Sequence, residues 1–166
     1  MTHPLVLQLR FTRSEFIRGL KGLSEEDAQR RILPMNSISW NVGHLTWHEQ
    51  RYFQVFAQDK ELYPEIGRQF AYGAPASTPA LAEMLAAWET VTAAVDPWLD
   101  TLTSEKLQEK LGRGNRIWGN LLQRVVYHYW YHNGENQAIR QQLGHASLAE
   151  FVGNIDEEAG YTPEAN

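Results

Sequence analysis

Two histidines and a glutamate stand at helical spacing in the segment 117–143, IWGNLLQRVVYHYWYHNGENQAIRQQL. His128, His132 and Glu135 fall on one face of the predicted helix, because they lie four and three residues apart. The rest of that face is apolar and consists of Ile117, Leu121, Val125, Ile139 and Leu143. Burying an unpartnered polar group costs about 1–3 kcal/mol, so a favourable interaction must offset the cost of burying these three polar side chains. A metal ion is the simplest candidate, since imidazoles one turn apart point the same way at about 6 Å.

A second pair of histidines has the same spacing in the segment 37–58, SISWNVGHLTWHEQRYFQVFAQ. The pattern predicts a helix in which His44 and His48 take core-facing positions. The other residues predicted to face inward are Trp40, Leu45, Tyr52, Val55 and Phe56. The remaining histidines, His3 and His145, lie near the N-terminus and past a helix end, and we assign them no role.

The chemistry of these residues favours an open metal site. The chain has no cysteine, so a metal must be held by nitrogen and oxygen, and neutral imidazole suits zinc, nickel, iron or copper. Three nitrogens from two helices leave positions for water or substrate. Glu135 could be a further ligand, an acceptor for an imidazole N–H or a general base on bound water. His48 has a weaker claim, because it could orient a ligand or bond to Tyr52 or a carbonyl.

Other interpretations of the histidines are weaker. A single buried histidine usually just finds a hydrogen-bond partner, but four at helical spacing on two inward faces favour a metal. The zinc-protease signature His-Glu-x-x-His is absent, because Tyr52 stands where the second histidine would be. There is no Glu-x-x-His pair either, which argues against a di-iron carboxylate bundle.

Four amphipathic helices are predicted to position these residues. They span 4–23, 37–58, a segment from 78–79 to near Pro97, and 117–143. No segment shows strand alternation between hairpin turns, so the predicted class is an all-α four-helix bundle. We expect one domain over 1–166, with the bundle at about 4–145 and a tail at 146–166. The tail carries a short apolar cluster at Leu148, Phe151 and Val152.

The connection 59–77, DKELYPEIGRQFAYGAPAS, is long for a compact domain and carries Tyr63, Phe70 and Tyr72. Long loops are often functional, so it is a candidate pocket wall or lid. The alternative is a surface crossover whose aromatic residues only cover the core.

Composition narrows the function classes. The net charge is −5 and the basic residues form no run, which argues against nucleic acid as a partner. We find no signal peptide and no membrane span, so a cytoplasmic location is the default expectation.

The runs SISWNVGHLTWHEQRYF and HYWYHNGENQAI resemble the DinB-like superfamily of metal-binding four-helix bundles. That superfamily includes thiol-dependent S-transferases and mycothiol-dependent maleylpyruvate isomerase, and a similar domain occurs in sulfoxide synthases that form ergothioneine. The resemblance implies that His44, His128 and His132 are the metal ligands. The His-x-x-x-His-x-x-Glu pattern ending at Glu135 is similar to the sulfoxide-synthase domain, and His48 is not among the standard ligands.

The resemblance further implies up-down-down-up order, with a long crossover between the second and third helices, and frequently a homodimer. It does not fix a reaction. Our leading hypothesis is a thiol-dependent S-transferase that uses one divalent zinc, nickel or iron ion, a small electrophile and a low-molecular-weight thiol. A metal-dependent hydrolase is the next hypothesis, and a non-catalytic metal-binding stress-response bundle is the competing one.

Overall fold

The computed structural model describes residues 2–112 and 115–163. Within these residues the chain forms eight α-helices and one π-helical segment, with no β-strand. The all-α class predicted from the sequence is therefore confirmed. No helix in this part of the chain is both long enough and apolar enough to cross a membrane.

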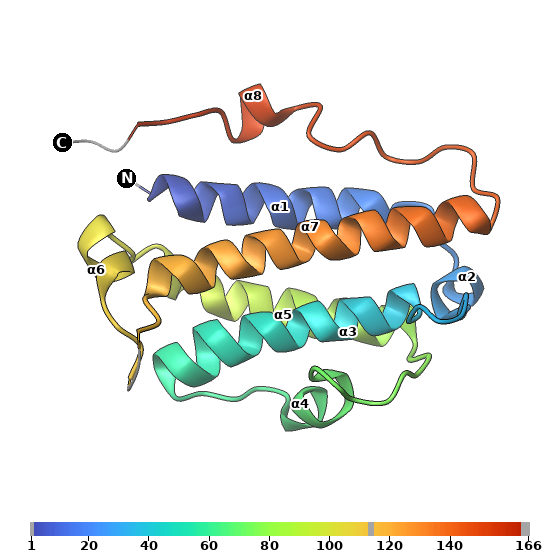
Figure 1. The fold of residues 1–166 in the computed structure, drawn as a ribbon, viewed down its shortest axis with the longest axis horizontal. Coiled ribbons are helices and arrows are strands. Elements are labelled where there is room, and N and C mark those ends of the chain that lie inside the picture. The colour runs from blue at the N-terminus through green and yellow to red at the C-terminus, as the bar shows by residue number, and fades with distance from the viewer. Residues whose placement is uncertain (1, 113–114, 164–166) are drawn as a thin grey trace.

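Four of the helices in the described residues are long, namely α1 (Pro4–Leu20), α3 (Ile38–Glu49), α5 (Leu81–Leu99) and α7 (Trp118–Gln142). In Figure 1, α1 lies beside α7 and α3 lies beside α5, and α3 also contacts α7. The short helices are α2 (Glu25–Gln29), α4 (Pro64–Phe70), α6 (Ser104–Gln108) and α8 (Ile155–Glu158). The predicted number of four therefore holds for the long helices only, and the connections and tail add the short ones.

Local capping explains where several helices begin and end. The Ser37 hydroxyl accepts a hydrogen bond from the backbone N–H of Trp40 at 3.2 Å and so begins α3. Ser24 begins α2 in the same way, because its side chain accepts a hydrogen bond from the backbone N–H of Asp27. His3, to which we assigned no role, caps α1 by accepting from the N–H of Leu5 at 3.1 Å. Gly144 follows α7 with a φ of +85°, the left-handed conformation that favours glycine after a helix.

The second predicted helix differs from the prediction at its C-terminal end. Residues Gln50–Phe56 form a π-helical segment that continues α3. A π turn takes more residues than an α turn, so it changes which side chains face the core. Phe53 is fully buried, whereas Phe56, which we predicted to face inward, is 38% exposed. The prediction was wrong at these two positions because it assumed uniform α-helical spacing.

A buried charged network joins the long helices. Arg13 of α1 donates two hydrogen bonds to the carboxylate of Glu49 in α3, at 2.8 and 2.7 Å, and one to Asp96 in α5 at 2.7 Å. The hydroxyl of Tyr129 in α7 donates to Glu49 at 3.1 Å and accepts from the indole N–H of Trp88 at 2.6 Å. Burial would lower the pKa of Arg13, but the charge of Glu49 and its hydrogen bonds raise that pKa above the usual value.

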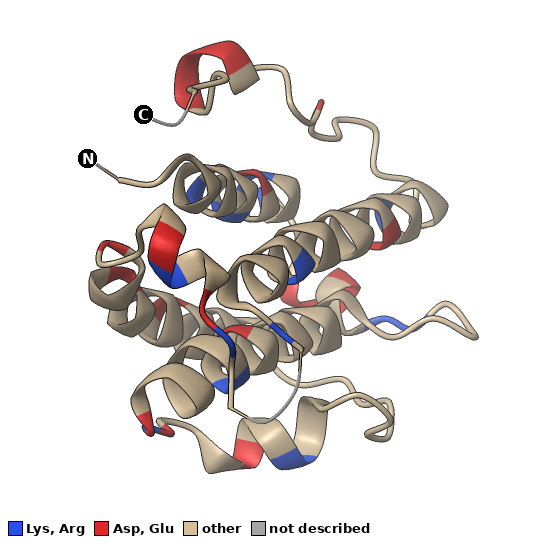
Figure 2. Ribbon diagram, turned by 60° about the vertical axis from the view of Figure 1, so that its left-hand side comes forward, with Lys and Arg blue, Asp and Glu red and all other residues tan. Residues whose placement is uncertain are grey.

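The tail runs back along α1 (Figure 1). Its predicted apolar cluster is only partly present: the Phe151 ring contacts the Trp130 ring, with centroids 6.1 Å apart, whereas Val152 is 46% exposed. A left-handed backbone at Val152, with a φ of +59°, turns the chain there. Figure 2 shows α8 as an acidic turn, and elsewhere acidic and basic residues are interspersed. The predicted tail residues 164–166 lie outside the described residues.

Replacing Gly43 with alanine should destabilise the protein by about 1–3 kcal/mol. A Cβ at Gly43 would lie 2.9 Å from the Met84 sulfur and from the Phe70 ring, so α3, α4 and α5 could not approach as closely. Gly134→Ala in α7 is the matched control, because nothing lies within 4 Å of its Cβ position, and it should stabilise by about 0.5–1 kcal/mol. Urea denaturation measures both. Equal effects of the two substitutions would contradict this explanation.

Candidate metal centre

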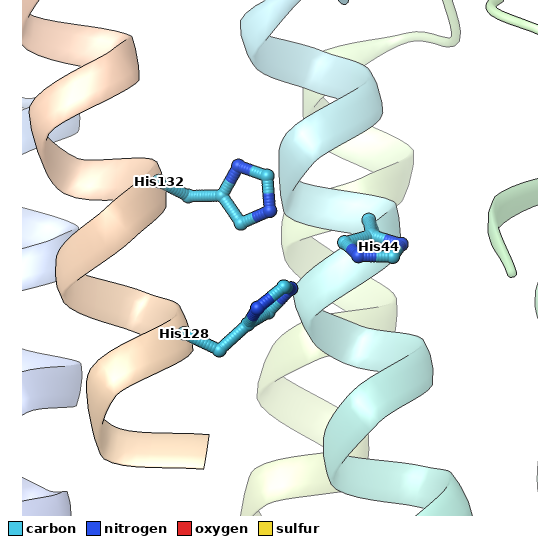
Figure 3. Close-up of side chains that lie close together, drawn as sticks. All are labelled: His44, His128 and His132. Carbon is cyan, nitrogen blue, oxygen red and sulfur yellow. The ribbon is translucent and has the colours of Figure 1, made fainter. Parts of the chain in front are cut away.

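The helices α3 and α7 bring the three predicted ligand residues together. His44 on α3 faces His128 and His132 on α7 (Figure 3). Each histidine offers one ring nitrogen, and the three nitrogens all lie within 4.8 Å of one another. The sequence spacing aligns the pair on α7, and the contact between α3 and α7 adds His44.

The ring of His44 is oriented by the segment that follows α4. Its Nδ1 lies 2.6 Å from the carbonyl oxygen of Phe70. A carbonyl only accepts hydrogen bonds, so Nδ1 carries the proton and Nε2 keeps its lone pair. The indole of Trp40 stacks on the same ring, with centroids 4.9 Å apart and planes at 15°. His44 is therefore held in one orientation with one nitrogen available as a ligand.

The ring of His132 is oriented by Glu135. Its Nδ1 lies 2.8 Å from Oε2 of Glu135, and the same oxygen accepts a hydrogen bond from the Asn41 amide at 2.9 Å. Acceptors of this kind fix the tautomer of metal-binding histidines and make the other nitrogen more basic. Of the three roles left open for Glu135, this geometry favours the acceptor of an imidazole N–H.

His48 lies next to the cluster without joining it. Its ring stacks on that of His128, with centroids 4.0 Å apart and planes at 28°. Its Nδ1 is buried and has no hydrogen-bond partner in the described part of the chain. It meets Tyr52 only ring to ring, at 5.5 Å. His48 thus packs behind His128, and the group of converging nitrogens consists of His44, His128 and His132.

Burial keeps the imidazoles of His44, His48 and His128 neutral. Burial, together with the neighbouring histidines, lowers the pKa of His44 to about 4 and that of His128 to about 3. The pKa of His48 falls to about 2 for the same reasons. Near pH 7 these rings carry no proton on their second nitrogen, which is the form that binds a metal.

The donor set fits a transition-metal ion. Nε2 of His128 and Nε2 of His132 are buried, and neither has a hydrogen-bond partner among the residues described. Buried polar atoms normally have hydrogen-bond partners, so two such nitrogens beside a third ligand atom fit a cation site. The ligand atoms of His44, His128 and His132 all lie within 4.8 Å of one another, so these three residues would hold the ion.

A pocket of about 640 Å³ opens at the cluster. His44, His128, His132 and Glu135 line it together with residues from the connection after α4. Those residues are Tyr72, Gly73 and Ala74. The connection thus provides the pocket wall that its length predicted. Its aromatic residue Phe70 instead covers the core, being 1% exposed, so the alternative interpretation is also right for α4.

The family model of the DinB superfamily matches residues 8–135. The chain belongs to the DinB superfamily. The match spans α1 to Glu135 and therefore includes every residue of the histidine cluster. No curated protein matches the chain.

Sequence reasoning missed two residues of this DinB-superfamily site. Asn41 bonds to Glu135 and, at 2.8 Å, to the side-chain oxygen of Asn136. It lies three residues before His44 on the same inward face, so its polarity in a buried stripe was a usable signal. The backbone carbonyl of Phe70 gives no signal in the sequence, because any residue type offers a carbonyl there.

Proposed function

We propose that this DinB-superfamily protein is a thiol-dependent S-transferase that uses one divalent metal ion held by His44, His128 and His132. The observation that carries the proposal is that His128 and His132, whose buried Nε2 atoms have no hydrogen-bond partner among the described residues, both line an open pocket. A structural ion would be enclosed by four protein ligands, whereas a catalytic ion keeps a position for substrate. The pocket of about 640 Å³ has room for a small electrophile.

The fold proposed with this function is the up-down-down-up bundle of the superfamily. The directions of the long helices in Figure 1 support it, since α1 and α7 run one way and α3 and α5 the other. The connection 57–80 would then be the crossover, with α4 inside it. We also propose that the protein acts as a homodimer, which sedimentation equilibrium would test.

A divalent ion bound here would supply Lewis acidity that lowers the pKa of a coordinated thiol. Glu135 lines the pocket, and its Oε1 has no hydrogen-bond partner among the described residues, so it can accept the thiol proton. The sulfur then bonds to carbon of the electrophile while the leaving group departs with its electron pair. The balance is thiol plus electrophile giving thioether, leaving-group anion and a proton.

The assay would use metal-loaded protein, 2-mercaptoethanol and 1-chloro-2,4-dinitrobenzene, with thioether absorbance as the readout. We expect a rate proportional to loaded protein and absent in the His128→Ala, His132→Ala double variant. An equal rate with the double variant would contradict the proposal. Metal-dependent cleavage of 4-nitrophenyl acetate without thiol would instead favour the hydrolase, and loaded protein inactive in both assays would favour a non-catalytic metal-binding protein.

Glu135→Gln should reduce turnover about 10- to 100-fold while metal affinity falls by less than about tenfold. The amide oxygen can still accept from Nδ1 of His132, which preserves the ring orientation, but the amide cannot take a proton from a thiol. The measurements are kcat and, separately, metal content by elemental mass spectrometry. A large loss of metal with unchanged turnover per bound ion would show that Glu135 only orients His132.

A further inference from the structure

A second pocket, a groove of about 450 Å³ on α7, shares part of its wall with the pocket at the histidine cluster. His128 and Tyr131 line both. The other residues of the groove are Asn120, Gln123, Arg124 and Tyr127. One residue of the histidine cluster, His128, therefore borders two cavities of different composition.

The groove is basic in a protein whose net charge is −5. Arg124 is the only charged side chain that lines the groove, because His128 is neutral near pH 7. No acidic residue lines it. Arg124 is exposed, and within the described residues it has neither an ion-pair partner nor an aromatic ring beneath it. Arg51, the other arginine near the histidines, is different, because its guanidinium lies 5.0 Å from the centre of the Trp47 ring.

The pocket at the cluster has the opposite character. Its one acidic side chain is Glu135, and its aromatic lining includes Trp40 and Tyr72. In the groove an anionic ligand would be attracted by Arg124, which lies one helical turn before His128. The two cavities thus differ in the charged side chain that lines them, Arg124 in the groove and Glu135 in the pocket.

The groove also leads away from the cluster. Gln123 and Tyr127 line both the groove and a cavity of about 860 Å³ between the start of α1 and the tail at Gly160, Tyr161 and Thr162. The groove and this larger cavity therefore adjoin at Gln123 and Tyr127.

We propose that this groove binds the thiol cosubstrate, and that Arg124 recognises a carboxylate on it. The inference rests on the proposed S-transferase function. A guanidinium fork matches a carboxylate with two hydrogen bonds, and side chains one turn apart on a helix are about 6 Å apart. Arg124 and His128 line the same groove, so a ligand with a carboxylate and a sulfur two or three carbons apart could contact both residues. Asn120 and Gln123 add amide groups beside it.

The test uses three thiols of similar size and different charge, namely 3-mercaptopropionate, 2-mercaptoethanol and cysteamine. Each would be titrated into the cobalt-substituted full chain, with the thiolate-to-cobalt absorption band as the binding readout. We expect affinity to fall in that order. Acidity alone would give the reverse order, because the ammonium group makes cysteamine the most acidic of the three thiols.

Arg124→Gln should weaken binding of 3-mercaptopropionate about tenfold and change that of 2-mercaptoethanol less than about twofold. Arg31→Gln is the control, since it removes the same charge from an exposed position outside the groove. Equal losses for both thiols, or no charge preference in the wild type, would overturn the role of Arg124 while leaving the proposed S-transferase function standing. If no thiol binds the cobalt, both proposals fail.

Discussion

Replacing His44 with alanine should lower the affinity for a divalent transition metal at least about 100-fold, so that protein which purifies with about one ion per chain loses it. His44 is the one member of the cluster that comes from α3. Without it the pair on α7 can offer only two nitrogens, and an open site with two protein ligands holds transition metals weakly. Elemental mass spectrometry on untagged protein measures the content and also identifies the metal.

Two further variants make this result specific. The His128→Ala, His132→Ala double variant should lose the metal as completely as His44→Ala. His48→Ala should keep it, because the His48 ring only stacks on His128. An ion that binds the folded state alone raises its stability by about 2.7 kcal/mol at 100 times its dissociation constant, so added metal should raise the melting temperature of the wild type and of His48→Ala only. Unchanged metal content in His44→Ala would refute the ligand assignment.

The histidine cluster could be predicted from the sequence because its residues follow the periodicity of an α-helix. His128 and His132 share a face through their spacing alone, and His44 occupies an inward position of a helix that had to pack against theirs. Helix α3 is buried along its whole length, so polar residues on it stood out against an apolar background. Where a side chain is constrained by helical periodicity and burial together, sequence reasoning reaches its position.

The features that sequence reasoning missed depend on backbone geometry and on packing between distant segments. The π-helical segment after Glu49 exchanged Phe53 for Phe56 in the core, and its residues have no composition that distinguishes them from an α-helix. The carbonyl of Phe70 orients His44 only because α4 lies against α3, where Gly43 leaves room for the Phe70 ring. The cavity at Gln123 and Tyr127 likewise exists only once the tail and α1 are placed beside α7.

Replacing Arg13 with alanine should destabilise the protein by about 3–5 kcal/mol, although Arg13 is not part of the histidine cluster. The Arg13 and Glu49 side chains are 6% and 0% exposed, so the substitution leaves a buried carboxylate without its cation. For a chain of this size the melting temperature should fall by about 6–20 °C. Differential scanning calorimetry of the metal-free protein provides the measurement.

Arg10→Ala is the matched control for Arg13→Ala. Arg10 lies on the same helix and contacts the same Asp96 at 3.7 Å, but its side chain is 32% exposed. Water screens such a pair, so its loss should cost no more than about 1 kcal/mol. A double substitution of Arg13 and Glu49 by methionine should cost less than Arg13→Ala, because it leaves no unpaired charge. Equal small effects of Arg13→Ala and Arg10→Ala would mean that the charged network does not fix α1 against α3. The position of α3, and with it His44, would then depend on other contacts of α3, such as those with α4, α5 and α7.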